Sequence, residues 1–397
     1  EAGLNSTPGV SSIEGIPTNV PFGQYGGDND ADNSGVITYV SIRHGGTEIG
    51  AGNEINGFTL GGVGSGTTIN NVEVIANMDD GIEFFGGTVS IQNAMVAGVG
   101  DDSYDYDEGW RGQLNSNWVA VASSDDGDRG GEHDGGTDPE TAQPYATPTI
   151  TYATFVGRGV DAGKRALTFR DNAGGNYSNS VFFNYAKGVD VEDLSEGEDS
   201  YSRFLSGELT FTNNVVDCGS NAFVTSQGED LSAYFNANGN STSSDHGLTW
   251  SPSAVSLAGR ADWASWTLAM TSGWVSPGEA VQGDVVVSSN VTGTAYWTAN
   301  NTYHLDGSVF VEPGATLHIE AGTVVKGMPG QGEESSYLCV AKGAQIFAEG
   351  TADAPIIFTF EADPLDGSTP LTTRGQWGGL IVLGEAGLNS TPGVSSI

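Results

Sequence analysis

The first thirteen residues of the chain, EAGLNSTPGVSSI, recur without a change as residues 385–397. An internal repeat constrains architecture before any single residue does, because repeated units stack against their neighbours. We therefore interpret the chain as one window on a longer head-to-tail array; a short duplicated motif is the alternative. Whether neighbouring units are joined covalently as tandem repeats or dock noncovalently stays open at this point.

The charge of the chain excludes several classes of partner. Fifty Asp and Glu residues against thirteen Lys and Arg residues give a formal net charge of −37, which repels nucleic acid and anionic membrane surfaces. No apolar run approaches the roughly 20 residues of a membrane helix. With 37% hydrophobic residues the chain still has enough apolar surface to fold. Divalent cations are the partners that its charge favours.

Short segments of alternating apolar and polar residues return along the chain and end at Gly, Asn or Asp, a pattern typical of strands and corners. Three of them carry Asn71, Asn93 and Asn117 at matching places, with steps of 22 and 24 residues. The longer step from Asn117 to Ala153 predicts a loop inserted at a corner. The in-phase return favours an all-β parallel β-helix over a sandwich or a barrel, because closed sheets require no such repeat.

The same pattern divides the chain into three parts. Residues 1–227 and 284–397 carry the coil pattern, whereas residues 228–283 interrupt it. Within this irregular insertion, RADWASWTLAM, which starts at Arg260, predicts one short helix that packs its tryptophans against the body.

Four phrases of the sequence resemble a known family: LDGSVFVEPGATLHIEAGTVVKG, GQWGGLIVLGEA, NEINGFTLGGVGSGTTINNVEV and DDGIEFFGGTV. They are similar to segments of secreted bacterial surface proteins of the Bacteroidota type. The resemblance implies a right-handed parallel β-helix at the cell surface or in the extracellular space, mostly without an assigned activity. In that family the part resembling residues 284–384 precedes the part resembling residues 1–278. This chain therefore has the order of a circular permutation, or of a window cut from a head-to-tail array.

Acidic pairs recur at the same place in three successive coils: Asp79 and Asp80, Asp101 and Asp102, Asp125 and Asp126. Stacked coils lie about 4.8 Å apart, so these carboxylates form a ladder of like charges that requires compensation. Calcium takes about six to eight oxygen ligands from carboxylates and carbonyls. We therefore predict that Ca²⁺ binds the ladder and stabilises the coils. The alternative is that these acids only keep the surface solvated.

A further set of candidate ligands lies in the loop GGDNDADNSG. Asp28, Asp30 and Asp32 alternate there as in calcium loops, but Asn33 stands where an EF-hand has its glycine and the distal Glu is missing. More acids follow near the ladder in sequence: Glu83, Asp105, Asp107, Glu108, Asp128, Glu132 and Asp134.

The cysteine and histidine residues match no metal motif. Cys218 and Cys339 are too far apart for a metal or redox spacing, and a disulfide or two buried thiols are both open. The histidines share no zinc-binding spacing, so we expect them at polar corners or on the surface: His44, His133, His246, His304 and His318.

The leading functional hypothesis is a structural one, the subunit of an extracellular filament or surface stalk. Open strand edges at the ends of a solenoid invite another copy, monomeric solenoids cover those ends with polar caps, and neither chain terminus carries a recognisable cap. Identical units that stack head to tail without closing form an open fibre.

Two alternatives from other classes stay open. One is a monomeric adhesin whose loop Gly100–Gln113 presents Tyr104, Tyr106 and Trp110 to polysaccharide. The other is a polysaccharide lyase or hydrolase, since parallel β-helices host both. A lyase requires a base, for which Lys164, Arg165 and Arg170 are available, and a hydrolase requires a pair of carboxylates. No single group stands out, so we predict no catalytic residue.

Overall fold

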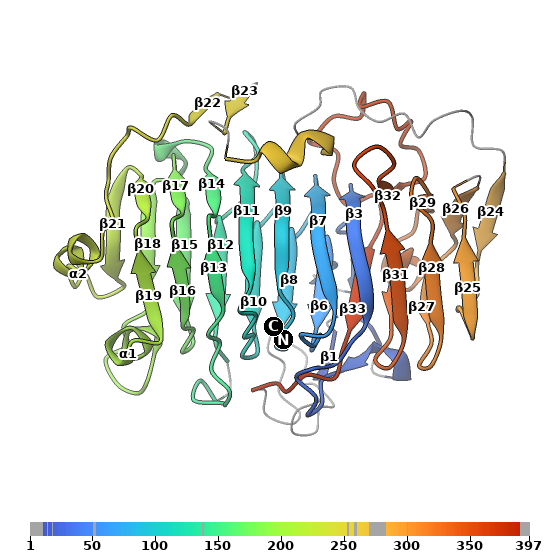
Figure 1. Cartoon of the computed structure of the whole chain (residues 1–397), viewed down its shortest axis with the longest axis horizontal. Helices are drawn as coiled ribbons and strands as arrows, with labels where there is room; N and C mark the ends of the chain where they lie inside the picture. The colour runs from blue at the N-terminus through green and yellow to red at the C-terminus, as the bar shows by residue number, and fades with distance from the viewer. Residues whose placement is uncertain are drawn as a thin grey trace.

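The chain folds into one elongated parallel β-helix (Figure 1). The computed structural model describes residues 11–13, 15–17, 19–50, 53–136, 139–251, 254–257, 260–269, 283–299 and 301–389. Strand after strand pairs in parallel with the strand of the next coil, which confirms the predicted fold class.

One side of the solenoid is a ten-stranded parallel sheet, here called Sheet 1. In spatial order its strands are β21 (Ser220–Thr225), β18 (Lys187–Val191), β15 (Arg165–Arg170), β12 (Gly131–Asp134), β10 (Tyr104–Asp107), β8 (Ile82–Phe85), β6 (Phe58–Gly61), β33 (Gly379–Leu383), β30 (Tyr337–Val340) and β27 (Ser308–Val311).

The other two sides are parallel ladders that meet at a corner, here called Sheet 2 and Sheet 3. Sheet 2 contains β25 (Thr294–Trp297), β28 (Thr316–Ile319), β31 (Gln345–Glu349), β3 (Gly35–Arg43), β7 (Thr68–Ile75), β9 (Ile91–Ala97), β11 (Asn115–Val121), β13 (Thr149–Thr151), β16 (Gly175–Ser178) and β19 (Leu209–Thr212). Sheet 3 contains β24 (Asp284–Val287), β26 (Thr302–Leu305), β29 (Val324–Gly327), β32 (Ile356–Phe360), the second halves of β3, β7, β9 and β11, then β14 (Thr154–Val156), β17 (Val181–Phe183) and β20 (Val215–Asp217).

The corner between Sheets 2 and 3 is built from residues in the left-handed conformation. Asn71, Asn93 and Asn117 have φ of 51°, 60° and 56°, which asparagine tolerates better than most residues. Their amides form a ladder: Asn93 Nδ2 donates to Asn71 Oδ1 at 3.2 Å, and Asn117 Nδ2 donates to Asn93 Oδ1 at 2.8 Å. The predicted equivalence of these three residues is therefore confirmed. In the next coil the corner residue is Tyr152, with φ of 59°, so the predicted alignment with Ala153 is wrong by one residue.

The spatial order of the coils differs from their order in the sequence. Strand β33 pairs with β6, and β3 pairs with both β31 and β32. Coils that come late in the sequence thus stack directly on the first coils, and the first and last described segments of the chain lie beside the middle of the solenoid rather than at its tips (Figure 1). The first and third sequence segments share one set of sheets.

Aromatic side chains fill the interior. Phe84 stacks on Trp110 with ring centroids 3.9 Å apart, and Tyr104 stacks on Trp118 at 4.5 Å. His133 lies between Tyr106 and Tyr177 without solvent exposure, and burial lowers its pKa to about 3. The expectation of a corner or surface position is therefore wrong for His133, which lies within β12. His44 is also fully buried, but it stands at the corner directly after β3, with φ of 54°.

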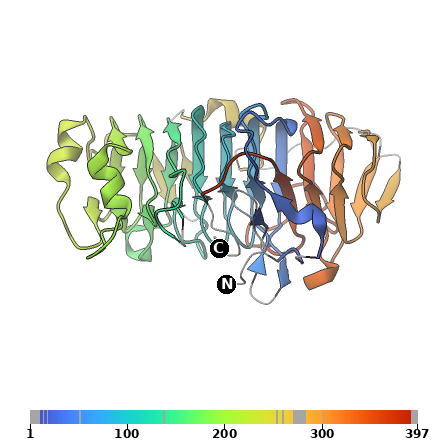
Figure 2. The ribbon, with the colours of Figure 1, turned by 90° about the horizontal axis from the view of Figure 1, so that it is seen from below.

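One tip of the solenoid is covered. The helix α2 (Ser232–Ala237) lies over the last coil, where Phe235 is 2% exposed and contacts Phe223. The backbone that follows continues the ladder, because Asn213 and Val216 donate to Asn238 and Ser241. A second helix, α1 (Ser200–Ser206), lies near the same end (Figure 2). A cap is therefore present at this tip, contrary to the expectation from the chain termini.

At the opposite tip, β24 and β25 are the outermost strands that the structure describes. Val286 on β24 is 59% exposed and Tyr296 on β25 is 68% exposed. Residues 270–282, which precede β24, lie outside the described residues.

The insertion forms a strap that returns along Sheet 3 (Figure 1). It contains the antiparallel pair β22 (Thr249–Ser251) and β23 (Ala254–Ser256) and the 3₁₀ helix η3 (Asp262–Trp266), where the sequence predicts a helix. Glu73 accepts a hydrogen bond of 3.0 Å from the Ala269 amide and holds the end of the strap.

Both cysteines are free thiols. The remaining short elements lie at the corners. They are β1 (Ser11–Ser12), β2 (Gln24–Tyr25), β4 (Glu48–Gly50), β5 (Asn53–Glu54), η1 (Pro21–Gly23), η2 (Val160–Ala162) and η4 (Gly332–Glu334). The described parts of the repeated sequence pack onto the body: Ile13 and Leu388 are 5% and 6% exposed. No helix in the described part of the chain has the length and hydrophobicity of a membrane span.

Candidate functional site

An acidic groove runs along the outer face of Sheet 1 and its adjoining corner. Strand alternation explains why the acids face outward: Ile82, Phe84, Tyr104 and Tyr106 point into the core, so the residues between them point to the solvent side. The groove encloses about 560 Å³, and eleven of its seventeen lining residues are acidic. These are Glu54, Asp79, Asp80, Glu83, Asp101, Asp105, Asp107, Glu132, Asp134, Asp171 and Glu192.

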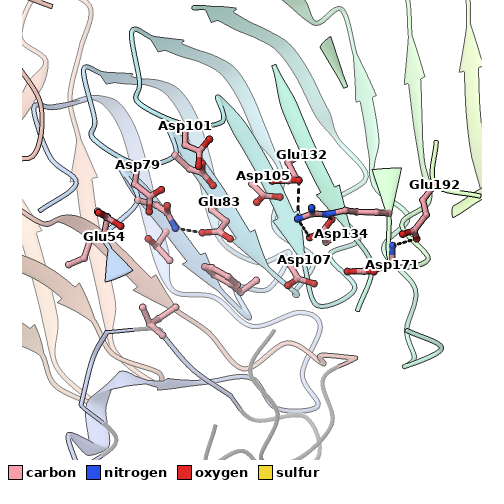
Figure 3. Close-up of a pocket in the computed structure, with 17 residues that line it drawn as sticks. Glu54, Asp79, Glu83, Asp101, Asp105, Asp107, Glu132, Asp134, Asp171 and Glu192 are labelled. Atoms are coloured by element: carbon pink, nitrogen blue, oxygen red, sulfur yellow. Dashed lines mark hydrogen bonds and ion pairs between the residues drawn. The ribbon is translucent and has the colours of Figure 1, made fainter. Parts of the chain in front are cut away.

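The acids lie in register from coil to coil. Thr59, Glu83, Asp105 and Glu132 are successive partners on β6, β8, β10 and β12. Figure 3 shows the labelled carboxylates as a row that crosses these strands, from Glu54 and Asp79 at one end to Glu192 at the other. Like charges on neighbouring strands repel each other. The fold therefore concentrates negative charge along this row, and the carboxylates destabilise one another unless positive charge compensates them.

Two arginines neutralise one half of this row. Arg170 donates to both carboxylate oxygens of Asp134, at 2.7 and 2.9 Å, and lies 2.9 Å from Glu132. Arg129 contacts Glu132 at 3.0 Å and Asp102 at 3.2 Å. The hydrogen bond to Asp134 and the surrounding carboxylates raise the pKa of Arg170, so its guanidinium stays charged and is no proton acceptor.

The other half of the row brings together five carboxylates. Asp79, Asp80 and Asp101 form one group and Asp80, Glu83 and Asp105 form another, and within each group the oxygens lie within 4.8 Å of one another. We call these five residues, which share Asp80, the acid cluster. Burial and the neighbouring carboxylates raise the pKa of Asp80 and of Asp105 well above the usual range, because both effects disfavour the ionised form.

Two buried oxygens of the groove have no partner among the described residues. Thr59 is 1% exposed and lines the groove, yet its hydroxyl makes no hydrogen bond. One carboxylate oxygen of Asp105 is likewise buried without a partner. Buried polar atoms are nearly always satisfied, and the acid cluster together with these oxygens has the donor set that Ca²⁺ prefers.

Of the predicted ligands, Asp79, Asp80 and Asp101 lie together in the acid cluster. Asp102 belongs to a group with Asp101 and Asp128 on the far side of the ladder. Asp125 and Asp126 do not join: they are exposed and lie 3.4 Å from Arg374.

The third acidic pair, Asp125 and Asp126, lies outside the ladder because the corner loop that carries it is longer. After β11 the loop is three residues longer than after β9, and Asp128 donates its backbone N–H to Asp101. Asp128 and Arg129 thus occupy the positions at which the coil spacing predicts Asp125 and Asp126.

The predicted loop site is not assembled. Asp30 is paired with Arg111 at 2.9 Å, and Asp32 accepts a hydrogen bond from Ser34 at 3.1 Å. Asp28 is exposed. None of the three belongs to a group of close carboxylates among the described residues.

The predicted sugar-binding aromatics are core residues. Tyr104, Tyr106 and Trp110 are at most 1% exposed, so the loop Gly100–Gln113 cannot present them to a ligand. Tyr104 and Tyr106 follow the strand period of β10, with Asp105 between them on the outer face, whereas Trp110 lies in the loop after the strand and turns inward to stack on Phe84.

Sequence reasoning missed the far end of the groove. Glu140, Asp171 and Glu192 form another close group, although they come from three separate coils. Burial, followed by Asp134 and Glu192, raises the pKa of Asp171 to about 7. No spacing rule links these residues, because the loops between them differ in length.

Comparison with known proteins identifies the family. The sequence model described as pectate-lyase like beta helix domain matches residues 7–269 and 289–397, which is most of the chain. No curated protein matches the sequence, and no solved structure matches it either. On this match, and with the parallel coils described above, the chain belongs to the pectate-lyase-like β-helix family.

Proposed function

We propose that this protein is an extracellular polysaccharide-binding β-helix whose acidic groove holds Ca²⁺. The observation that carries the proposal is the acid cluster: five carboxylates share one side of the groove while the nearby arginines serve the other side. Ca²⁺ supplies the missing positive charge, and the unpartnered oxygens of Thr59 and Asp105 add ligand atoms.

The groove suits a chain-like ligand. It follows the solenoid axis across successive strands of Sheet 1 (Figure 3), and a cation bound at its floor can bridge the protein carboxylates to hydroxyl or carboxylate oxygens of a polysaccharide. The extracellular location is part of the same proposal: weak calcium sites of extracellular modules fill at about millimolar concentrations of Ca²⁺.

Isothermal titration of Ca²⁺ into the metal-free protein tests the cation site. We expect saturable binding that the double variant Asp80→Asn, Asp105→Asn abolishes, and that the control variant Asp353→Asn, in an exposed turn, leaves unchanged. Retention on a polyanionic polysaccharide such as polygalacturonate tests the ligand: we expect it in Ca²⁺ and not in EDTA. Wild-type protein that takes up no Ca²⁺, or polygalacturonate retention that is equal in EDTA, contradicts the proposal.

A hydrolase is the second candidate, and Asp171 favours it. A glycosidase requires one protonated and one ionised carboxyl, and a pKa of about 7 keeps part of Asp171 protonated near neutral pH. Glu140 and Glu192 supply carboxylates within 4.8 Å. Release of reducing ends from a panel of polysaccharides, lost in Asp171→Asn, would support this role, whereas no turnover by the wild type argues against it.

A filament subunit is the structural alternative. Head-to-tail stacking requires two open tips, and α2 covers the tip at β21. The exposed strands β24 and β25 still favour self-association at the other tip. Long fibres in negative-stain micrographs would support the filament, and dispersed particles or pairs would not.

A further inference from the structure

Sheet 2 carries a second surface whose chemistry is opposite to that of the groove. Its outward residues form two columns across β3, β7, β9, β11, β13, β16 and β19. The first column is Thr38, Asn70, Gln92, Ser116, Thr151, Ser178 and Thr212, in register from strand to strand. The second, two residues earlier in each coil, is Val36, Thr68, Ser90, Leu114, Thr149, Asn176 and Thr210. We call these fourteen residues the neutral face.

The lack of charge on this face is a property of the sequence and not of the fold. None of the fourteen residues is charged, although the chain carries a net charge of −37. Sheet 1 shows that the same solenoid accepts acids at outward positions, since Glu83, Asp105 and Glu132 stand in one column there. From β3 to β19 the chain therefore keeps its acids out of both columns, and the first column meets an acid only beyond Thr38, at Glu349 on the neighbouring strand β31.

The neutral face includes a hollow of about 450 Å³ beside β7, β9 and β11, within the usual range of ligand sites. Uncharged hydrogen-bonding side chains dominate its lining, among them Thr68, Asn70, Ser90, Gln92 and Gln113. Its basic residue, Arg111, is already paired with Asp30.

Several groups in the hollow are available to a ligand. Thr68 and Gln92 are exposed, and their side chains make no hydrogen bond among the described residues. The Asn70 side-chain oxygen accepts hydrogen bonds from Thr38 at 2.7 Å and from Asn71 at 2.9 Å, and its Nδ2 donates to no group among the described residues. Leu114 is 70% exposed at the edge and offers an apolar contact.

We propose that the neutral face binds an uncharged polysaccharide, with the hollow at β7 and β9 as its main subsite. Hydroxyl and amide side chains match the donors and acceptors of sugar hydroxyls, and the flat, repeating columns match a repeating chain. A nucleic acid requires basic groups that this face lacks. A protein partner, or a second copy of this chain, requires an apolar core, whereas the neutral face offers Val36 and Leu114 as its only aliphatic members.

Two assays of the full chain test the proposal. One is affinity electrophoresis in gels that contain laminarin, glucomannan or dextran, and the other is pull-down on microcrystalline cellulose and chitin. All measurements are made in EDTA, so that they do not depend on the calcium groove. We expect retention on at least one of these polymers, and a loss of about tenfold in affinity in Gln92→Ala with Asn70→Ala, since each lost hydrogen bond weakens binding severalfold.

Two controls make the outcome decisive. Gln331→Ala removes an exposed glutamine outside the neutral face and is expected to bind as the wild type does. Melting curves establish that the double variant is folded; if it is not, Gln92→Glu alone serves, because it adds a charge with little change in shape. Absence of retention on every polymer, or retention that only the Asp80→Asn, Asp105→Asn variant reduces, overturns the proposal.

Discussion

The Oδ1 atom of Asp80 accepts a hydrogen bond of 2.9 Å from the backbone N–H of Asp102, one coil further along the solenoid. Asp102 repeats the arrangement by accepting from the backbone N–H of Arg129. These carboxylates therefore connect the coils through one oxygen each. Arg129 also pairs with Asp102 at 3.2 Å, whereas Asp80 has no ion pair with a Lys or Arg in the described part of the chain. The ladder therefore links successive coils and also supplies carboxylates to the proposed cation site.

Removing and restoring Ca²⁺ is expected to change the melting temperature. A ligand that binds only the folded state at 100 times its dissociation constant stabilises it by about 2.7 kcal/mol, so saturating Ca²⁺ is expected to raise the melting temperature and EDTA to reverse the rise. Differential scanning fluorimetry with Asp353→Asn as the control and Asp105→Asn as the test variant checks this. A melting temperature that changes with neither Ca²⁺ nor EDTA rules out a stabilising cation.

The metal-free protein is expected to lose stability as the pH rises. The pKa values of Asp80, Asp102, Asp105 and Asp107 are raised in the folded state, mainly by burial, and that of Asp171 is raised to about 7. Above the unfolded pKa of about 4 the folded state binds more protons, so its stability falls with increasing pH. Denaturant melts in EDTA should give a lower free energy of unfolding at pH 8 than at pH 5.5.

Ca²⁺ is expected to flatten that pH dependence, because the cation stabilises the ionised carboxylates. Burial lowers the pKa of His133 to about 3, which contributes the opposite slope below about pH 6.5. The variant Asp171→Asn separates the contribution of the acids from that of His133, because it removes one raised carboxyl pKa and leaves His133 unchanged. An apo protein that is more stable at pH 8 than at pH 5.5 contradicts the assignment of the acids.

Two substitutions of Asp102 separate its hydrogen bond from its charge. Asp102→Asn keeps an acceptor for Arg129 and removes a buried charge whose pKa is raised, so we expect the metal-free variant at pH 8 to be at least as stable as the wild type. Asp102→Ala removes the acceptor of the partly buried Arg129 N–H, which costs about 1 kcal/mol. Urea melts of both variants measure the difference in the free energy of unfolding. Equal stabilities would show that the hydrogen bond between Asp102 and the Arg129 N–H does not stabilise the fold.

Trp118 is expected to be a main stabilising residue of the core. It is fully buried and stacks on Tyr104, and replacing a buried aromatic residue by alanine costs about 3–5 kcal/mol. Tyr152, at an exposed corner with 54% of its surface accessible, is the matched control, and Tyr152→Ala should change the free energy of unfolding by less than about 1 kcal/mol. Similar losses in the two variants would refute the central role of the aromatic stack.

The local features of the fold could be read from the sequence. Alternation of apolar and polar residues marks the strands, and the steps between Asn71, Asn93 and Asn117 give the coil, because a stacked ladder repeats the same conformation at the same corner. For the same reason Asp79, Asp80 and Asp101 come together: the corner loops after β7 and β9 have equal lengths, so equal sequence spacing becomes equal register.

Only the tertiary structure decided the rest of the site. Three extra residues after β11 replace Asp125 and Asp126 by Asp128 and Arg129, and residues from distant coils complete the far end of the groove. The stacking of β33 on β6 and the cover that α2 lays over the last coil likewise depend on contacts between distant segments. Strand periodicity is a local property of a few residues, whereas register, the order of coils and capping follow from which hydrogen bonds and apolar surfaces meet once the chain has folded.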